Sequence, residues 1–148
     1  MSVLLSWVGT TDLEENTKRG AICDILRDIE INQLFLLYDS IRYKRVLGAG
    51  GFVHTLRSKH PKLYIRAKKV IINHPNDIES IYSATEQLIY MHRKSKVYIN
   101  LSSGSGIMAA SWVLATSRVD PSKINQPILL ESSWQRGTQF INIPTPTQ

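Results

Sequence analysis

The sequence predicts an α/β domain with a Rossmann-like, mostly parallel sheet of six strands, helices on both faces and a C-terminal β-hairpin. Short apolar runs alternate along the chain with segments whose apolar residues recur at helical spacing. This alternation is typical of parallel strands joined by crossover helices. Residues 134–137 lie between the last two apolar runs, and this short spacing favours an antiparallel hairpin at the sheet edge.

The strands are identified by their apolar runs. Residues 3–8 are continuously apolar, apart from one serine, as expected for a strand covered on both faces. The third run alternates apolar and polar residues before ending in Val70-Ile71-Ile72. The six expected strands span residues 3–8, 33–38, 62–72, 97–101, 127–132 and 139–143.

The helices are identified by apolar residues three and four positions apart. This spacing predicts helices over residues 19–30, 78–92 and 106–117. Asn76 or Asp77 is the expected N-cap of the second helix, since both side chains accept hydrogen bonds from first-turn amides. Glycines interrupt residues 41–61, although residues 52–56 could form a short helix.

The length of 148 residues and the composition, 43% hydrophobic and 20% charged, fit one globular domain, expected over residues 1–143. Residues 144–148, Pro-Thr-Pro-Thr-Gln, are expected to be a disordered tail or a truncated linker. No apolar run approaches the roughly 18 residues of a membrane span, and none resembles a signal peptide. The single cysteine, Cys23, excludes an internal disulfide, so a cytoplasmic location is expected.

The formal net charge is +6, and many basic residues lie in the middle third of the chain. One interpretation is a set of lysines and arginines scattered in solvent, and the other is a partner rich in phosphate. The middle-third residues are Arg42, Lys44, Arg45, Arg57, Lys59, Lys62, Arg66, Lys68 and Lys69.

Two strand ends carry the candidate binding site. The strand at 97–101 runs into a hydroxyl-rich loop with two glycines, and the strand at 3–8 ends in a shorter polar loop. In the doubly wound strand order these two strands are neighbours where the winding reverses, and ligands bind over the carboxyl ends there. Loop amides and a helix N-terminus favour phosphate. The expected ligand-binding residues are Gly9, Thr10, Thr11, Asp12, Ser102, Ser103, Gly104, Ser105 and Gly106.

Structural roles alone could also explain both loops. The second loop could be a compact strand-to-helix turn in which Ser103 or Ser105 caps the helix, and the side chains of the first loop could cap a turn. Residues 48–52 contain three glycines but do not match a dinucleotide fingerprint, which must follow the first strand.

No metal ligand set or catalytic residue set stands out. The four histidines have no metal-ligand spacing, so ordinary surface or turn positions are expected for them, with no metal or cofactor. Trp7 and Trp112 lie in apolar periodic runs and are expected in the core, whereas Trp134 lies in a turn and is the best candidate for an exposed aromatic.

The apolar first strand ending in Gly9-Thr10-Thr11, the exit at residues 99–105 and the Trp112-containing helix resemble a CRISPR-associated Rossmann-fold (CARF) domain. Within that family, the chain resembles the N-terminal sensor domain of the sigma-54-dependent activator of RNA repair. The resemblance implies a homodimer that binds cyclic oligoadenylate, or a related RNA end, across its two-fold axis, in type III CRISPR signalling and antiviral defence. The two loops would contact the ligand, and an effector domain or protein would lie outside this chain.

The ring size favoured is four adenylates, since these place two on each subunit of a symmetric dimer. A sensor that binds without turnover is the first hypothesis. The alternative is a metal-independent ring nuclease, in which Thr10, Thr11 and Ser105 position a ribose 2′-hydroxyl and Lys18 or Arg19 stabilises the developing charge. Sensing of RNA ends, or direct nucleic-acid binding through the net charge, are further alternatives.

Overall fold

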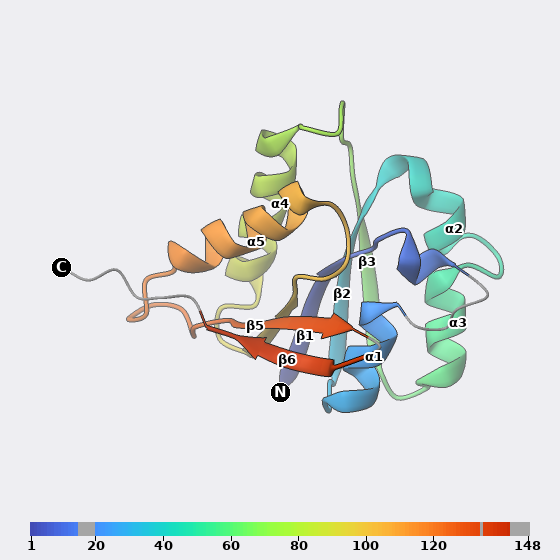
Figure 1. Cartoon of the computed structure of the whole chain (residues 1–148), viewed down its shortest axis with the longest axis horizontal. Coiled ribbons are helices and arrows are strands. Elements are labelled where there is room, and N and C mark those ends of the chain that lie inside the picture. The colour runs from blue at the N-terminus through green and yellow to red at the C-terminus, as the bar shows by residue number, and fades with distance from the viewer. Residues whose placement is uncertain (15–19, 134, 143–148) are drawn as a thin grey trace.

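The computed structural model describes residues 1–14, 20–133 and 135–142. Six strands form one sheet in the order β3-β2-β1-β4-β5-β6. All neighbouring pairs are parallel except β5 and β6, which form the antiparallel hairpin. The predicted Rossmann-like α/β fold is therefore confirmed (Figure 1). The strands are β1 (Ser2–Trp7), β2 (Gln33–Asp39), β3 (Tyr64–Val70), β4 (Lys96–Asn100), β5 (Ile128–Ser133) and β6 (Gly137–Ile141).

Helices cover both faces of the sheet, as the sequence predicts. One apolar core joins α1, α2 and α3 to one face of the sheet, and a second joins α4 and α5 to the opposite face (Figure 1). Trp7 and Trp112 are both fully buried in the second core, as expected. The helices are α1 (Ala21–Asp28), α2 (Tyr43–Leu47), α3 (Phe52–Lys59), α4 (Ile78–Met91) and α5 (Gly106–Ser117).

The position of β1 between β2 and β4 creates the reversal of winding that the site requires. Its Leu4 pairs with Leu34 on one side and with Tyr98 on the other. The chain leaves β1 toward α1 on one face and leaves β4 toward α5 on the other. The loops that follow β1 and β4 consequently diverge from adjacent strand ends, which leaves a crevice between them.

Differences from the sequence prediction lie at element ends, in the 3₁₀ turn η1 (Thr11–Leu13) after β1 and in residues 41–61. There the chain forms two 3₁₀ or α-helical turns before α3: η2 (Ser40–Arg42) and α2. Only Val46 of α2 is buried, so α2 lacks the repeated apolar spacing by which a helix is identified in sequence. Asp77 is confirmed as the N-cap of α4 and accepts a hydrogen bond from the Ser80 amide at 3.3 Å.

Some sequence predictions concern residues outside the described part of the chain: the exposed Trp134, the first residue of the helix expected at 19–30, the last residue of the sixth strand, the tail at 144–148, and the cations Lys18 and Arg19. Within the described ranges, the helices are too short or too polar to cross a membrane.

Candidate functional site

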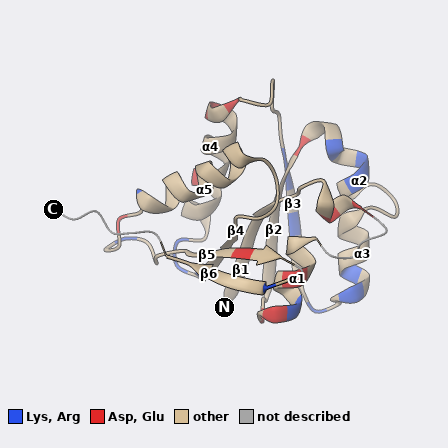
Figure 2. Cartoon of the chain, in the orientation of Figure 1, with Lys and Arg blue, Asp and Glu red and all other residues tan. Residues whose placement is uncertain are grey.

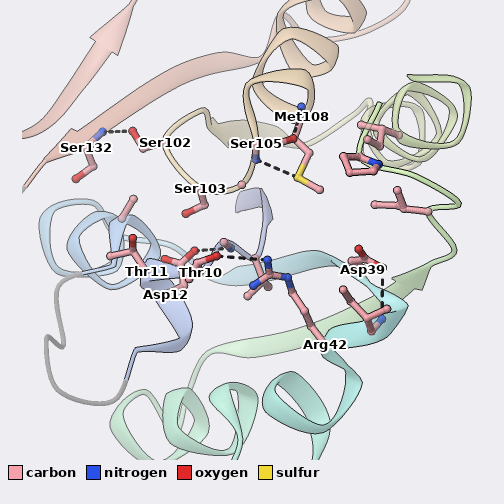
Figure 3. A pocket seen from close by; sticks show the side chains of 18 of the residues that line it. Thr10, Thr11, Asp12, Asp39, Arg42, Ser102, Ser103, Ser105, Met108 and Ser132 are labelled. Carbon is pink, nitrogen blue, oxygen red and sulfur yellow. Dashed lines mark hydrogen bonds between the residues drawn. The ribbon is translucent and has the colours of Figure 1, made fainter. Parts of the chain in front are cut away.

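A cleft of about 770 Å³ lies at the carboxyl ends of β1, β2 and β4. Its walls come from the loops after these strands, from the segment between β3 and α4, and from the end of β5 (Figure 3). The size is within the range of pockets that bind small molecules. All of the loop residues expected from the sequence line it except Gly106.

Asp12 holds the first loop in place. Its carboxylate accepts hydrogen bonds from the Gly9 amide at 2.9 Å and from the Ile22 amide at 3.3 Å. Ile22 lies in the first turn of α1, whose N-cap is Gly20, a residue with no side chain to cap it. A Cβ on Gly20 would lie 2.5 Å from an Asp12 carboxylate oxygen, so the glycine makes room for a capping group that lies 10 residues before Ile22 in sequence.

Burial raises the pKa of Asp12, and hydrogen bonds from Gly9, Ser103 and Ile22 oppose the increase. Asp12 is 8% exposed. Since both of its oxygens are already bonded to amides of its own loop and helix, Asp12 acts chiefly as an organiser of the loop.

The two loops touch through glycines. A Cβ on Gly9 would lie 2.5 Å from the Gly104 amide nitrogen, closer than real Cβ atoms approach. Gly104 itself has φ +94°, and a Cβ there would lie 2.6 Å from Met108 Sδ and 3.2 Å from Trp7 Cβ. The crevice floor is therefore formed by two backbone segments in close approach, which only glycine permits.

Asn100, at the end of β4, organises the second loop from below. Its side-chain amide donates to Ser103 Oγ at 2.8 Å and to Ser6 Oγ at 3.1 Å. Its carbonyl oxygen accepts the Ser102 amide at 2.9 Å. Asn100 and Ser6 are fully buried, so this network ties β1, β4 and the loop together in the interior.

The serine hydroxyls of the second loop also have structural partners (Figure 3). Ser102 Oγ accepts the Ser132 amide of β5 at 2.8 Å. Ser105 is the N-cap of α5 and accepts the Met108 amide at 3.3 Å. A capping role for Ser105 is one of the alternatives that the sequence left open, and the structure confirms it. Ser102 and Ser105 are nevertheless exposed, so their hydroxyls also face the cleft.

Thr10, Thr11 and Arg42 form the opposite wall of the cleft. Both threonines are exposed, and Arg42 Nη2 donates to Thr10 Oγ1 at 3.3 Å (Figure 3). Arg42 follows β2, so its guanidinium brings positive charge from a third strand end to the first loop. Across the cleft, the first-turn amides of α5 have no carbonyl partner inside the helix and carry partial positive charge. The combination suits an anionic ligand.

The structure thus brings the two predicted loops together at one cleft. Gly106 begins α5 at its edge. Lys18 and Arg19, the cations expected to stabilise charge, lie outside the described residues.

Some residues that line or support the site were not assigned to it from the sequence: Asn100, Arg42, His74 and Ser132. Asn100 is a polar residue that directly follows the apolar residues 97–99 of β4, and this pattern could have identified it from the sequence. Arg42 carries no such signal, because its threonine partner is 32 residues away in sequence. His74 reaches the cleft through the segment between β3 and α4, and Ser132 through β5.

Comparisons with known proteins identify similar folds. No protein-family model matches the sequence, and no curated protein matches it. Csm6 from Enterococcus italicus, solved bound to cyclic hexa-2′-fluoro-hexa-dAMP, superposes on 90% of this chain with a TM-score of 0.74 and 19% identity. Protein VC1899 from Vibrio cholerae superposes on 99% of it with a TM-score of 0.65 and 12% identity. At these identities the likeness establishes the fold.

The matched structures are much longer than this chain, which covers 33% of the Csm6 chain and 34% of VC1899. Their structural likeness does not distinguish the RNA-repair activator from other proteins with this fold.

Proposed function

We propose that this chain is a CARF domain that senses cyclic oligoadenylate in type III CRISPR signalling. The observation that carries the proposal is the cleft between the β1 and β4 loops, at the reversal of winding, with Arg42 on one wall and the N-terminus of α5 on the other. The sequence resemblance and the fold likeness to Csm6, itself solved with a cyclic adenylate analogue, support the same ligand class.

The chemistry of the cleft fits an oligoadenylate in three respects. Phosphates match the α5 N-terminus and the Arg42 guanidinium. Exposed hydroxyls of Thr10, Thr11 and Ser105 offer donors and acceptors to ribose and base edges. The close approach of Gly9 and Gly104 keeps the floor free of side chains, so a ligand can lie directly on backbone amides.

The functional unit in this proposal is a homodimer that encloses one ring. Three isoleucines stand in solvent at or beside the cleft: Ile41 after β2, Ile71 after β3 and Ile78 at the start of α4, with 82%, 65% and 57% of their surface exposed. Ile41 lines the cleft. Exposed apolar side chains around a polar cleft are typical of a surface that a partner covers. A two-fold axis over this edge would present both clefts to one ring.

Four adenylates remain the favoured ring size, because each subunit then contacts two nucleotides. The Csm6 structure contains a six-membered ring, so the hexamer is the first alternative ligand. RNA ends bearing cyclic phosphate are the alternative from the RNA-repair resemblance.

Ring-nuclease activity is a second candidate function, favoured by one observation. Arg42 lies against Thr10 inside the cleft, where a cation could stabilise charge developing on a phosphate as an adjacent ribose 2′-hydroxyl attacks it. That attack forms a 2′,3′-cyclic phosphate and releases the 5′-oxygen of the next nucleotide, which takes up a proton. Among the described residues, Arg42 thus takes the role that the sequence assigned to Lys18 or Arg19.

One experiment separates these functions. Purified protein is mixed with radiolabelled cyclic tetra-adenylate or cyclic hexa-adenylate and resolved on native gels for binding and on denaturing gels for cleavage. A retarded, intact ring is expected for the sensor. Linear products in the wild type, lost in Arg42→Gln at protein concentrations high enough to saturate the ring despite weaker binding, would establish the nuclease.

Variants of the cleft test the location of the site. Thr11→Ala is expected to weaken binding, since its side-chain hydroxyl is exposed in the cleft. Ser83→Ala on the exposed face of α4 is the matched control and should bind as the wild type does. Unchanged affinity in both Thr11→Ala and Ser103→Ala would show that the proposed site is wrong.

A further inference from the structure

The charges of this chain are segregated along the sequence. Residues 40–76 contain nine lysines and arginines and no acidic residue, whereas the rest of the chain contains nine basic and twelve acidic residues. The net charge is therefore +9 within this segment and −3 outside it. Such asymmetry indicates an anionic partner for the basic part.

The fold gathers these charges at one end of the sheet. Helices α2 and α3 lie beside β3, which is the edge strand at one end of the sheet. The basic side chains concentrate on these three elements and on the turn before β3 (Figure 2). Arg42 belongs to the cleft, and the other eight residues are all exposed. We call them the basic flank: Lys44, Arg45, Arg57, Lys59, Lys62, Arg66, Lys68 and Lys69.

Among the described residues, no carboxylate forms a salt bridge with the basic flank. Within the described residues, the salt bridges are those of Arg27 with Asp24 and Asp28 on α1. Arg45 and Arg57 donate hydrogen bonds to the backbone carbonyls of Leu13 and Ile65, and these neutral acceptors do not neutralise the guanidinium groups. Lysines on an edge strand can serve to prevent edge-to-edge aggregation, but this role does not account for the cations on the two helices.

Strand β3 adds an aromatic ring to the charge. Tyr64, Arg66 and Lys68 alternate along the strand and therefore share one face. The Tyr64 ring is half exposed, and its centroid lies 6.0 Å from that of Phe35 on β2. Phe35 in turn packs on the buried His92 at 4.1 Å. The contact with Phe35 thus supports the Tyr64 ring on one side, while another part of the ring remains exposed to solvent.

From these observations we propose that the basic flank binds single-stranded RNA, independently of the cleft. Positive charge that follows a backbone, combined with rings on which bases stack, is how proteins bind single strands without sequence preference. Ile65 and Ala67 of β3 pack into the core below α1–α3, so Arg66 and Lys68 point to the opposite face of the sheet from the cations of α2 and α3. A flexible RNA chain can follow the charges around the β3 edge of the sheet. A flat anionic membrane cannot contact the cations on both faces of the sheet at once.

The test uses a fluorescent oligouridylate of about 20 nucleotides, which exceeds the site size of common single-strand binders and contains no adenylate that could enter the cleft. Anisotropy titrations over a range of KCl concentrations give the affinity and its salt dependence. Arg66→Gln/Lys68→Gln is compared with Lys94→Gln/Lys123→Gln, which removes the same charge from exposed turns outside the flank. Tyr64→Leu is compared with Tyr64→Phe, because only phenylalanine keeps an aromatic face.

Wild-type binding that weakens with salt is expected. The Arg66/Lys68 variant should bind about tenfold more weakly, with a salt slope lower by about 1.4, since each phosphate contact to a single strand contributes about 0.7. The Lys94/Lys123 control should change little. Tyr64→Leu should lose about tenfold in affinity and Tyr64→Phe should retain it.

Three results would overturn the proposal: absence of wild-type binding near physiological salt, equal weakening in the two double variants, or binding to phosphatidylserine vesicles but not to oligouridylate. Binding of cyclic tetra-adenylate is measured in the same variants and should be unchanged. These measurements distinguish a wrong assignment of RNA binding to the basic flank from a wrong assignment of cyclic oligoadenylate binding to the cleft.

Discussion

The side-chain amide of Asn100 donates a hydrogen bond to Ser103 Oγ at 2.8 Å, and both residues are buried, Asn100 at the end of β4 and Ser103 in the loop that forms one wall of the cleft. The same side chain reaches Ser6 on β1, so a single residue joins the two strands at which the winding reverses. The shape of this loop is therefore coupled to the pairing of β1 with β4.

Replacing Asn100 by alanine should affect both stability and binding. Ser6, Ser103 and the Ser102 amide would each lose a partner. Leaving a buried polar group unpaired costs about 1–3 kcal/mol, so the free energy of unfolding should fall by at least about 2 kcal/mol. Denaturant unfolding measures this loss, and gel retardation measures the accompanying loss of cyclic oligoadenylate binding.

Thr116→Val is the control for Asn100→Ala. Thr116 is also buried, but its Oγ1 lacks a hydrogen-bond partner among the described residues. Valine at this position should therefore leave stability unchanged or raise it slightly. Equal destabilisation by both substitutions would contradict the special role assigned to Asn100.

Gly104 and Gly106 should respond in opposite ways to alanine. Gly104 has φ +94° and no space for a Cβ, whereas a Cβ on Gly106 would meet nothing within 4 Å. We expect Gly104→Ala to lower the free energy of unfolding by about 2 kcal/mol, from the conformational cost together with the clash. Gly106→Ala, at the first position of α5, should be neutral or slightly stabilising. Thermal unfolding of both variants distinguishes them, and equal melting temperatures would show that the loop geometry is wrong.

Asp12 should titrate above the usual range of an aspartate. Burial raises its pKa, so the folded protein binds this proton more tightly than the unfolded chain does. Ionisation of Asp12 therefore opposes folding, and this destabilising contribution develops as pH rises from about 3.8 through the folded-state pKa. Carboxyl-carbon NMR titration of the folded protein measures the midpoint. A midpoint at or below that of a model aspartate would contradict the burial of Asp12.

His92 should make the protein less stable in mild acid. Burial lowers its pKa from the ordinary value of 6.5, so below that pH the unfolded chain takes up a proton that the folded protein resists. Stability supplied by neutral His92 is present above about pH 6.5 and is lost as pH falls through the folded-state pKa. Denaturant unfolding should show a smaller decrease between about pH 7.5 and 5.5 in His92→Leu than in the wild type. An identical decrease would exclude His92 as the cause.

Most of the fold could be predicted from the sequence because it depends on local periodicity. The apolar run of β1 and the helical spacing of apolar residues in α4 both indicate directly which side chains are buried. The short helix α2 could not be predicted, because five residues with one buried valine leave no period to detect.

The position of the cleft could also be predicted, but the roles of the individual residues that form it could not. Loop composition and the strand-order rule place both loops at one edge. Composition does not reveal that Asp12 caps α1 or that Asn100 supports the second loop, because those roles arise from contacts between segments far apart in sequence. Arg42 is the clearest example, since only the folded chain brings it to Thr10.

Isothermal titration of cyclic tetra-adenylate into the purified chain shows whether the cleft holds this ligand. We expect saturable binding of one ring per two chains, with weaker binding by Arg42→Gln. Absence of binding to either the four-membered or the six-membered ring would contradict the assignment of the cleft as a cyclic oligoadenylate site.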